Sequence, residues 1–480
     1  MIDAGIGANS ASATGYNIDN SVKLEADNSE YFSKTPSSNS NRQNFTFSTW
    51  VKRTELGQNA RLIDAHQDGQ NFFTFGFDTS DRLVIYNIDS GVDYGGHYTQ
   101  RFRDTSAWYH IVFRSETTSG TATTRWKIYV NGVEITAKDT DYGTPPRWYQ
   151  SNLNSTISHK VGYNTDGSNG SSQYMAETHL VDGTPLLPTS FGEFDDDSGI
   201  WKPIKVDVTY GTNGFYLDYT DGSDLGNDAN ASNNFAENNL TAADQSTDTP
   251  TNNFATGNPL AFFSNPTTST FNPITEGATQ FKKGAGGWET MTSSIAVTSG
   301  KWYMELQNIS VPESVMMAIL PVDAELIFRG GRVSYHPGAS SGDGGVAQYG
   351  YNGTLYVEGV GTTYSPSPSW ANGTDVMGIA LDMDNGKVYF AKGNTWMNNG
   401  DPTTGSTGTG AVNIPDYTTK PYVFGYSLYA NNSYGRMNFG GYTSGSISSA
   451  ESDADGYGNF EYAPPTGYYA LCTKNLAEYG

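Results

Sequence analysis

"WKIYVNGVEI", residues 126–135, is the stretch that decides the fold of the first half of the chain. Its residues before Asn131 are aromatic or β-branched apart from Lys127, which is the composition of a strand. Asn131-Gly132 is a pair that two-residue hairpin turns prefer, because both turn positions need a positive φ. Val133 and Ile135 continue on the returning strand, so the stretch predicts an antiparallel hairpin.

Further strands are expected on both sides of this hairpin. In "FTFSTWVKR", residues 45–53, the odd positions share one face and the even positions the other, which is a period-two strand pattern. Similar stretches occur at 72–77, 83–88 and 108–115. Only 16% of the residues are charged, whereas Gly, Tyr and Phe are abundant. No stretch shows a helical apolar repeat or about 18 consecutive apolar residues, so we expect neither a helical bundle nor membrane insertion.

The length of 480 residues allows two or three domains of roughly 100–200 residues each. We expect a terminal segment at 1–17, a β-sandwich at 18–182, an Asn/Thr/Pro-rich connector with short strands at 183–285, and a second β-sandwich at 286–480. Within the connector, "GFYLDY" at 214–219 has a strand pattern and is expected to brace the first sandwich. In the second sandwich a hairpin is expected at 376–391 and strands at 301–308, 422–428 and 468–473. The predicted fold class is all-β.

The order of the pieces carries two resemblances. "SVKLEADNSEYFSKT", "FTFSTWVKR", "WYHIVFRSE" and "WKIYVNGVEI" together resemble the laminin-G-like jelly roll of the concanavalin A-like lectin and glucanase superfamily, over roughly the first 180 residues. The second half resembles the SPRY domain through "VTSGKWYMEL", "GTDVMGIALDMDNGKVYFAKGNTW" and "NFGG". It departs from the SPRY pattern at Gly393-Asn394, where the order of the two residues is reversed.

The two sandwiches, the connector and the closing "YAPPTGYYALCTKNL" are similar to predicted virion proteins of tailed phages, particularly marine ones. This resemblance implies a tail-fibre-like or capsid-attached surface protein that is not an enzyme. Its expected partners are a host-surface glycan, other virion proteins or both, and we expect a homo-oligomer, with a trimer favoured. A purely structural coat or decoration component is one alternative. A polysaccharide-degrading hydrolase of concanavalin-like fold is another.

Net charge and cysteine content limit the classes of ligand and the cellular compartment that are expected for this chain. The net charge is −23 and the acidic residues are spread along the chain, so nucleic acid is not expected as a ligand. Cys472 is the single cysteine, which excludes an intrachain disulfide, and we expect it to be buried in the strand at 468–473. "MIDAGIGANS" has neither the basic nor the apolar region of a signal peptide. The chain is therefore expected to be made in the host cytoplasm and to leave within a virion.

No catalytic residue is predicted. Glycoside hydrolysis needs two carboxylates facing each other about 5–10 Å apart, and the Glu-x-Asp-x-x-Glu arrangement of glucanase relatives does not occur. The six histidines show no H-E-x-x-H spacing, and no G-x-S-x-G nucleophile motif is present.

Candidate residues for binding a ligand or a metal ion are chosen by residue type alone. Exposed aromatic rings stack on sugars, and the candidates in expected loops are Trp148, Tyr149, Trp201, Tyr349, Tyr351, Trp370 and Trp396. The alternative is that these rings fill sandwich edges and subunit contacts. No cofactor is expected, although calcium stays open because hard cations bind clustered oxygens. Its candidate ligands are Asp195, Asp197, Asp382, Asp384, Asp453 and Asp455.

Overall fold

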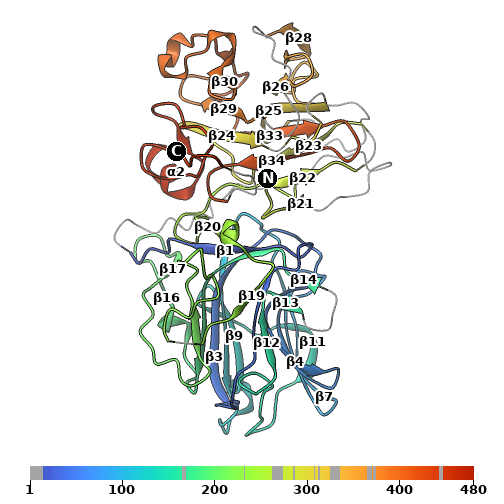
Figure 1. The fold of residues 1–480 in the computed structure, drawn as a ribbon, viewed down its shortest axis with the longest axis vertical. Coiled ribbons are helices and arrows are strands. Elements are labelled where there is room, and N and C mark those ends of the chain that lie inside the picture. The colour runs from blue at the N-terminus through green and yellow to red at the C-terminus, as the bar shows by residue number, and fades with distance from the viewer. Residues whose placement is uncertain are drawn as a thin grey trace. The chain divides into compact units, whose positions relative to one another are not determined.

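A computed structural model of the chain describes residues 15–164, 169–231, 233–261, 274–284, 287–307, 309–311, 314–324, 336–364, 370, 375–442 and 447–480. Asn9–Asn252 form one compact unit, the N-terminal unit, and Asn253–Gly480 lie in the other, the C-terminal unit. Both are built from sheets whose strands are almost all antiparallel (Figure 1). The predicted all-β fold with two β-sandwiches is confirmed. None of the described helices has the length and hydropathy needed to cross a membrane.

The N-terminal unit contains two large sheets. Sheet A consists, in spatial order, of β10 (Val133–Ile135), β9 (Trp126–Val130), β8 (Trp108–Glu116), β3 (Asn44–Arg53), β15 (Gln173–Asp182), β1 (Ser21–Leu24) and β20 (Gln245–Ser246), and β18 (Phe215–Leu217) also pairs with β15. Sheet B consists of β11 (Lys138–Gly143), β7 (Val92–Arg101), β6 (Arg82–Asp89), β5 (Asn71–Phe77), β4 (Ala60–Asp68), β12 (Ser158–Val161), β2 (Tyr31–Lys34) and β19 (Ala236–Asn238). The period-two strands predicted from the sequence lie within these sheets.

Aromatic side chains fill the space between sheets A and B. The ring of Phe47 on β3 lies edge-on to that of Phe75 on β5, with 6.2 Å between centroids. Phe113 on β8 contacts Phe73 on β5 at 5.7 Å, so the two sheets are joined by ring contacts. All four rings are fully buried, as the alternating pattern of β3 and β5 requires.

The outer face of sheet A is also covered, by residues 186–216, which we call the strap. Val112, Tyr129 and Val181 on sheet A pack against Phe191 and Tyr210 of the strap. Strand β18 begins at the end of the strap, β19 and β20 come after it, and all three extend the two sheets. The expected connector at 183–285 is thus divided between the units: its first part completes the N-terminal sandwich, and the stretch predicted as a strand at 214–219 contains β18.

The C-terminal unit also has two sheets. Sheet C consists of β21 (Ile274–Thr275), β22 (Gln280–Lys282), β34 (Tyr434–Asn438), β24 (Lys301–Gln307), β29 (Met377–Asp382), β30 (Lys387–Lys392) and β31 (Thr395–Trp396), with β32 (Val412–Asn413) on β30 and β35 (Tyr469–Ala470) parallel to β24. Sheet D consists of β23 (Glu289–Thr292), β33 (Tyr422–Leu428), β25 (Val315–Pro321), β26 (Val346–Tyr349), β27 (Thr354–Val357) and β28 (Val360–Thr363).

The hairpin predicted at 376–391 joins β29 to β30, and Gly386 in its turn has a φ of 62°. The end of the chain differs from the prediction, because the strand expected at 468–473 is only the short β35. Helix α2 (Thr473–Tyr479) follows, and Cys472 is its N-cap residue. Cys472 is buried, as expected.

The remaining elements are short. Two hairpins are formed by β13 (Tyr163–Asn164) with β14 (Asn169–Gly170) and by β16 (Gly192–Phe194) with β17 (Trp201–Pro203). The described 3-10 turns are η1 (Ala122–Thr124), η2 (Pro188–Ser190), η3 (Ala242–Asp244), η5 (Met397–Asn399) and η6 (Pro402–Thr407).

Candidate functional site

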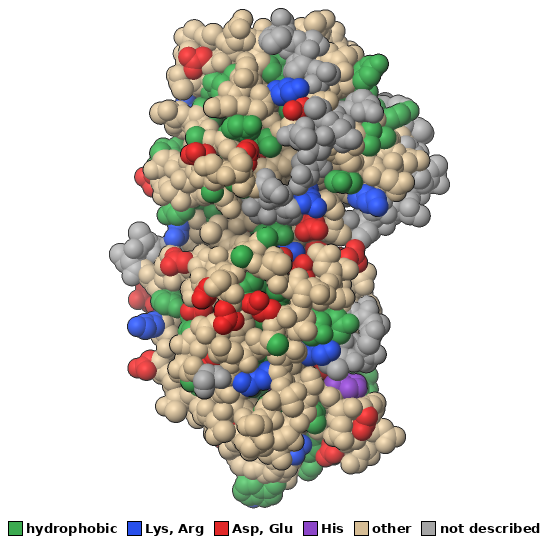
Figure 2. Space-filling view, viewed as in Figure 1, with side chains coloured by type: hydrophobic (Ala, Val, Ile, Leu, Met, Phe, Trp, Pro, Cys, Tyr) green, Lys and Arg blue, Asp and Glu red, His purple; other side chains and the backbone are tan. Residues whose placement is uncertain are grey.

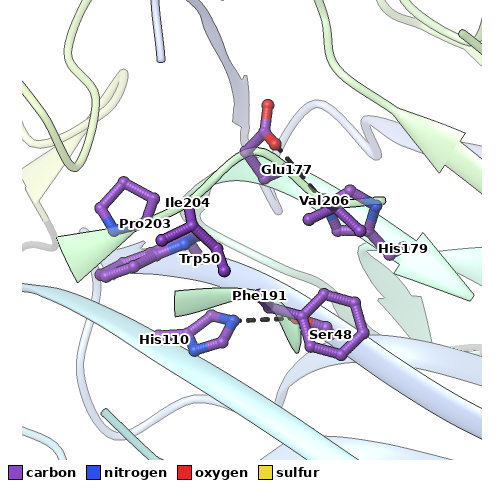
Figure 3. Close-up of a pocket in the computed structure, with 9 residues that line it drawn as sticks. All are labelled: Ser48, Trp50, His110, Glu177, His179, Phe191, Pro203, Ile204 and Val206. Carbon is purple, nitrogen blue, oxygen red and sulfur yellow. Dashed lines mark hydrogen bonds and ion pairs between the residues drawn. The ribbon is translucent and has the colours of Figure 1, made fainter. Parts of the chain in front are cut away.

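A small pocket lies between sheet A and the strap, and Figure 3 shows its lining. The residues that line it are Ser48, Trp50, His110, Glu177, His179, Phe191, Pro203, Ile204 and Val206. Its empty volume is about 170 Å³. This volume includes space open to solvent, and the pocket leaves essentially no room for even a water-sized molecule, so it is too small for a ligand.

One contact in the pocket has the geometry of a nucleophile and its base. The Oγ atom of Ser48 lies 2.8 Å from Nε2 of His110. The indole N–H of Trp201, however, donates to Nδ1 of His110 at 3.0 Å, and an indole nitrogen can only donate. Nδ1 therefore carries no proton, and the neutral ring holds its proton on Nε2 and donates it to Ser48. Burial lowers the pKa of His110 to about 3, so the ring stays neutral and does not take a proton from Ser48.

A second polar group in the pocket ties the strap to sheet A. Glu177 sits at a bulge in β15 with a φ of 49°, and its carboxylate accepts a hydrogen bond from the Tyr216 hydroxyl at 2.7 Å. His179 stacks on the ring of Tyr216 at 4.3 Å, and its Nδ1 lies 2.7 Å from the Tyr210 hydroxyl. Burial and the nearby Glu177 raise the pKa of the Tyr216 hydroxyl well above its usual value. These contacts give the pocket a structural role, because they fasten the strap.

A more open surface lies on the outer face of sheet B. His66 on β4, Phe72 on β5, Tyr86 on β6 and Tyr142 on β11 form a continuous row of rings, which we call the aromatic strip. Successive ring centroids are 5.4, 5.6 and 4.9 Å apart. Tyr142 is exposed and the other three rings are half-buried. The strip therefore presents ring surface to solvent across four strands.

Polar groups border the aromatic strip. The Tyr86 hydroxyl donates to Asp93 at 2.9 Å, which orients the ring. Thr74 pairs directly with Tyr86, and Asp64 pairs with Thr74, so all three share the outer face of the sheet. On the other side of Tyr86 the paired residue is Gly95, where a Cβ would lie 2.1 Å from the carbonyl oxygen of Ile85. Only glycine fits at this position, and β7 therefore places no side chain beside the Tyr86 ring.

The same face continues beyond Asp64 to a lysine between two further rings. Lys160 on β12 pairs with Asp64, and its Nζ lies 4.8 Å from the ring centroid of Tyr31 and 4.5 Å from that of Tyr163. The two tyrosine rings are 4.4 Å apart. Burial lowers the pKa of Lys160 while the nearby Asp64 raises it, with burial the larger influence. Asp64 and Thr74 are buried, whereas Asp93 and Lys160 are half-buried. Rings beside these carboxylate and ammonium groups can stack on a ligand and hydrogen-bond to it.

The aromatic residues predicted as ligand-binding loop residues differ in their exposure to solvent. Tyr149, Trp201 and Trp370 are only 7%, 4% and 6% exposed, so their rings are not available to a ligand and these three assignments are corrected. Trp148 and Tyr351 are exposed, at 54% and 61%. Tyr349 and Trp396 are half-buried.

The structure brings together only two of these seven residues in one cluster. Tyr349 lies 6.0 Å from Tyr351 and 5.7 Å from Trp288, and Trp288 lies 5.2 Å from Tyr429. We call these four rings, all in the C-terminal unit, the tyrosine cluster.

Sequence reasoning missed the aromatic strip because it looked for rings in loops. Phe72 and Tyr86 lie within strands that were predicted, at positions that alternate with the core residues Phe73 and Ile85. An aromatic residue on the outer face of a strand was the available signal.

The six aspartates considered for calcium lie in three separate turns. Oδ1 of Asp195 accepts from the backbone N–H of Ser198 at 2.9 Å, and its other oxygen pairs with Lys202 at 3.0 Å. Asp382 accepts from Asn385, and Asp384 accepts from the N–H of Gly300 at 2.8 Å.

The third turn is held in the same way. Asp453 accepts from the N–H groups of Asp455 and Tyr457 with one oxygen and from Ala470 and Asn475 with the other. The carboxylates of Asp195, Asp382, Asp384 and Asp453 thus anchor turns and neighbouring segments. Within the described residues, no three His, Cys, Asp or Glu side chains gather as a metal site needs.

One comparison with known proteins covers the part of the chain that carries the strip. Residues 27–172 match the family described as the concanavalin A-like lectin/glucanases superfamily. This range contains all four residues of the aromatic strip. No curated protein matches the sequence.

Solved structures show weaker likenesses. The SPRY domain of human HERC1 is 15% identical, with 38% of this chain and 96% of that chain covered and a TM-score of 0.28. Domain 4 of an extracellular arabinanase from Geobacillus stearothermophilus, in complex with arabinotriose, is 19% identical, with 31% and 65% covered and a TM-score of 0.24. A candidate carbohydrate binding protein from Bacteroides ovatus is 16% identical, with 47% and 60% covered and a TM-score of 0.32. Identities and TM-scores this low support no conclusion about what this chain does.

Proposed function

We propose that this protein is a non-enzymatic, glycan-binding surface protein of a tailed-phage virion, tail-fibre-like or attached to the capsid. The observation that carries the glycan-binding part is the aromatic strip on the outer face of a sandwich that matches the lectin and glucanase superfamily. The virion part rests on the resemblance of the two-sandwich arrangement to predicted phage proteins. In this proposal the chain assembles as a homo-oligomer, with a trimer favoured, and becomes extracellular with the particle.

Surface charge is in keeping with a glycan ligand. The chain carries a net charge of −23. On the face drawn in Figure 2, the Lys and Arg side chains of the described residues lie singly and do not form a basic patch. A polyanion such as nucleic acid needs a basic surface that displaces its counterions. An uncharged sugar needs instead a ring on which its C–H face can stack and polar groups for its hydroxyls, and the strip with the half-buried Asp93 supplies both.

The first test is binding of the labelled full chain to a glycan array. Tyr86→Ala removes the central ring of the strip and is expected to weaken binding to any glycan that scores by about tenfold, the equivalent of about 1.4 kcal/mol. Trp148→Ala and Tyr351→Ala remove exposed rings elsewhere and are the matched controls. Circular dichroism shows whether each variant is folded. Loss of binding in Tyr351→Ala but not in Tyr86→Ala would move the site to the tyrosine cluster and contradict the strip.

Two further measurements separate this proposal from its alternatives. Incubation of the chain with a bound glycan, followed by chromatography, is expected to return the glycan intact, whereas shortened products indicate a hydrolase. Cryo-electron microscopy of the particle is expected to show the strip facing outward. If the strip is covered by neighbouring virion subunits and no glycan binds, the protein is a purely structural coat component.

A further inference from the structure

Three buried ionisable side chains of the N-terminal unit meet at a place that the proposed glycan site does not use. Nζ of Lys23 lies 2.9 Å from Oδ1 of Asp244. The same nitrogen lies 3.2 and 3.0 Å from the two carboxylate oxygens of Glu30. Lys23, Glu30 and Asp244 are 1%, 3% and 5% exposed. An amine is thus held between two carboxyl groups in a space that water barely reaches.

The fold fixes the two ends of this contact independently. Lys23 lies on β1, and Asp244 ends the turn η3 immediately before β20, which pairs with β1 (Figure 1). The pairing of Val22 with Gln245 sets the position of each neighbouring residue. Glu30 is oriented by the side-chain amide of Asn28, which donates to it at 2.9 Å. None of the three groups depends on a mobile surface rotamer for its place.

The carboxyl group of Asp244 is also polarised. Its Oδ2 accepts hydrogen bonds from the backbone N–H of Thr241 at 2.8 Å and from the Thr241 hydroxyl at 3.1 Å. Two donors on one carboxyl oxygen, with an amine at the other, are the arrangement that stabilises negative charge on an acyl oxygen during attack at its carbon.

We propose that Lys23 and Asp244 become joined by an isopeptide bond between Nζ and Cγ, with Glu30 as the group that carries the proton. The lysine and the aspartate are the two substrates, and the product is a neutral amide that links β1 to η3. The bond closes the N-terminal sandwich covalently in a chain whose single cysteine cannot form an internal disulfide.

The reaction balances without a cofactor. A proton first passes from the Lys23 ammonium to Oδ1 of the Asp244 carboxylate, 2.9 Å away, which frees the lone pair of Nζ. The lone pair of Nζ attacks Cγ, and negative charge develops on Oδ2 beside the two Thr241 donors. Glu30 takes a proton from Nζ and delivers it to the departing Oδ1 hydroxyl. One C–N bond forms, one C–O bond breaks, one water molecule leaves, and nothing is oxidised or reduced.

Three features favour this reaction over a lasting ion pair. Holding the groups in contact raises their effective concentration to as much as about 10⁵–10⁸ M. Burial also raises the pKa of Glu30, with the nearby Asp244 adding to the shift and Lys23 opposing it, and this suits a group that must accept and then release a proton. The amide removes two charges whose burial is costly.

Mass spectrometry of the purified full chain tests the bond directly, without any variant. The expected intact mass is lower than the sequence mass by one water molecule. After trypsin digestion, residues 1–34 are expected to remain joined to residues 206–282, with no cleavage after Lys23. A full sequence mass would overturn the proposal. So would a water loss that maps to an Asp-Gly pair such as Asp221-Gly222, where succinimide formation causes the same change.

Variants test the assigned roles. Glu30→Gln keeps the size and a hydrogen-bonding side chain but carries no proton, so its chain is expected to have the full mass while it remains folded. Asp244→Ala removes the acyl group and is also expected to have the full mass. Asp248→Asn alters a second buried Lys–Asp pair of the N-terminal unit, in which Asp248 lies 2.7 Å from Lys52, and is expected to keep the water loss. A cross-link that persists in folded Glu30→Gln would remove Glu30 from the reaction and overturn its role.

Discussion

At the scale of single residues, two buried histidines of the N-terminal unit, His110 and His159, are held in one neutral form by the hydrogen bonds around them. His110 accepts a hydrogen bond from Trp201 on one ring nitrogen, and His159 likewise accepts a hydrogen bond on one of its ring nitrogens. His159 donates from Nδ1 to the carbonyl of Ile157 at 2.8 Å, and its Nε2 accepts from the backbone N–H of Asn154 at 3.0 Å. Protonation of Nε2 would break the second bond. Burial of the ring is the main cause that lowers the pKa of His159 to about 4, and the hydrogen bond to the Ile157 carbonyl opposes this shift.

This shift predicts a pH dependence. An unfolded histidine has a pKa of about 6.5, so between about pH 4 and 6.5 the unfolded chain binds more protons than the folded one. Stability from His159 is fully present above pH 6.5 and is lost as the pH falls toward 4. Between pH 7 and 5 the expected loss is about 2 kcal/mol from this residue, measured by urea unfolding. His159→Gln is expected to lose that much less over the same interval, and an equal loss in both proteins would contradict the assignment.

At the scale of elements, two hairpins of the N-terminal unit have the same turn but different surroundings. Asn131 and Gly132 join β9 to β10 with φ values of 46° and 80°, and Ser90 and Gly91 join β6 to β7 with 53° and 78°. A Cβ at Gly132 would lie 2.4 Å from two ring atoms of Trp201, whereas one at Gly91 meets nothing within 4 Å. The first hairpin therefore needs glycine for two reasons and the second for one.

Alanine at the two turn positions separates these reasons. Gly91→Ala is expected to cost about 1–2 kcal/mol of unfolding free energy, since alanine is strained at positive φ. Gly132→Ala is expected to cost about 1–3 kcal/mol more, because it also pushes Trp201 away from His110. Chemical denaturation followed by tryptophan fluorescence measures both. An equal loss of unfolding free energy in the two variants would show that Trp201 can move away from residue 132 without an energetic penalty.

At the scale of the whole molecule, the N-terminal unit runs to Asn252 rather than ending near residue 182. The strap covers the outer face of sheet A, and β18, β19 and β20 add strands to both sheets. Asp248 also pairs with the fully buried Lys52 at 2.7 Å and accepts from the indole of Trp108 at 3.0 Å. The residues after 182 thus supply apolar side chains that cover sheet A and the carboxylate that pairs with Lys52.

Truncation tests where the unit ends. A chain of residues 1–252 is expected to be soluble and to unfold cooperatively on heating, as followed by circular dichroism. A chain of residues 1–182 is expected to aggregate or lack a transition, because it exposes the outer face of sheet A and leaves Lys52 without Asp248. Loss of one partner of a buried ion pair alone costs about 3–5 kcal/mol. A cooperative transition of equal midpoint in the shorter chain would place the boundary near 182 instead.

Local patterning in the sequence determined which segments are strands and where the hairpins turn. Asn131-Gly132 predicted a hairpin because the turn preference is a property of two neighbouring residues. Period-two alternation likewise identified β3, β5 and β6, since opposite faces of a strand meet different surroundings. The concanavalin-like resemblance of the first half followed from the order of these strands, and residues 27–172 match that superfamily.

Only the tertiary structure decided what lies on the second face of each sheet. The polar segment after residue 182 has the composition of a linker, yet Phe191 and Tyr210 pack on sheet A, and this depends on a partner far away in the sequence. Trp201 was expected in a loop with its ring open to a ligand. In the structure the ring is buried, and its N–H donates to His110. The row of His66, Phe72, Tyr86 and Tyr142 exists only once the register of four strands aligns them. Such contacts join residues through the folded sheet, and the sequence alone does not state that register.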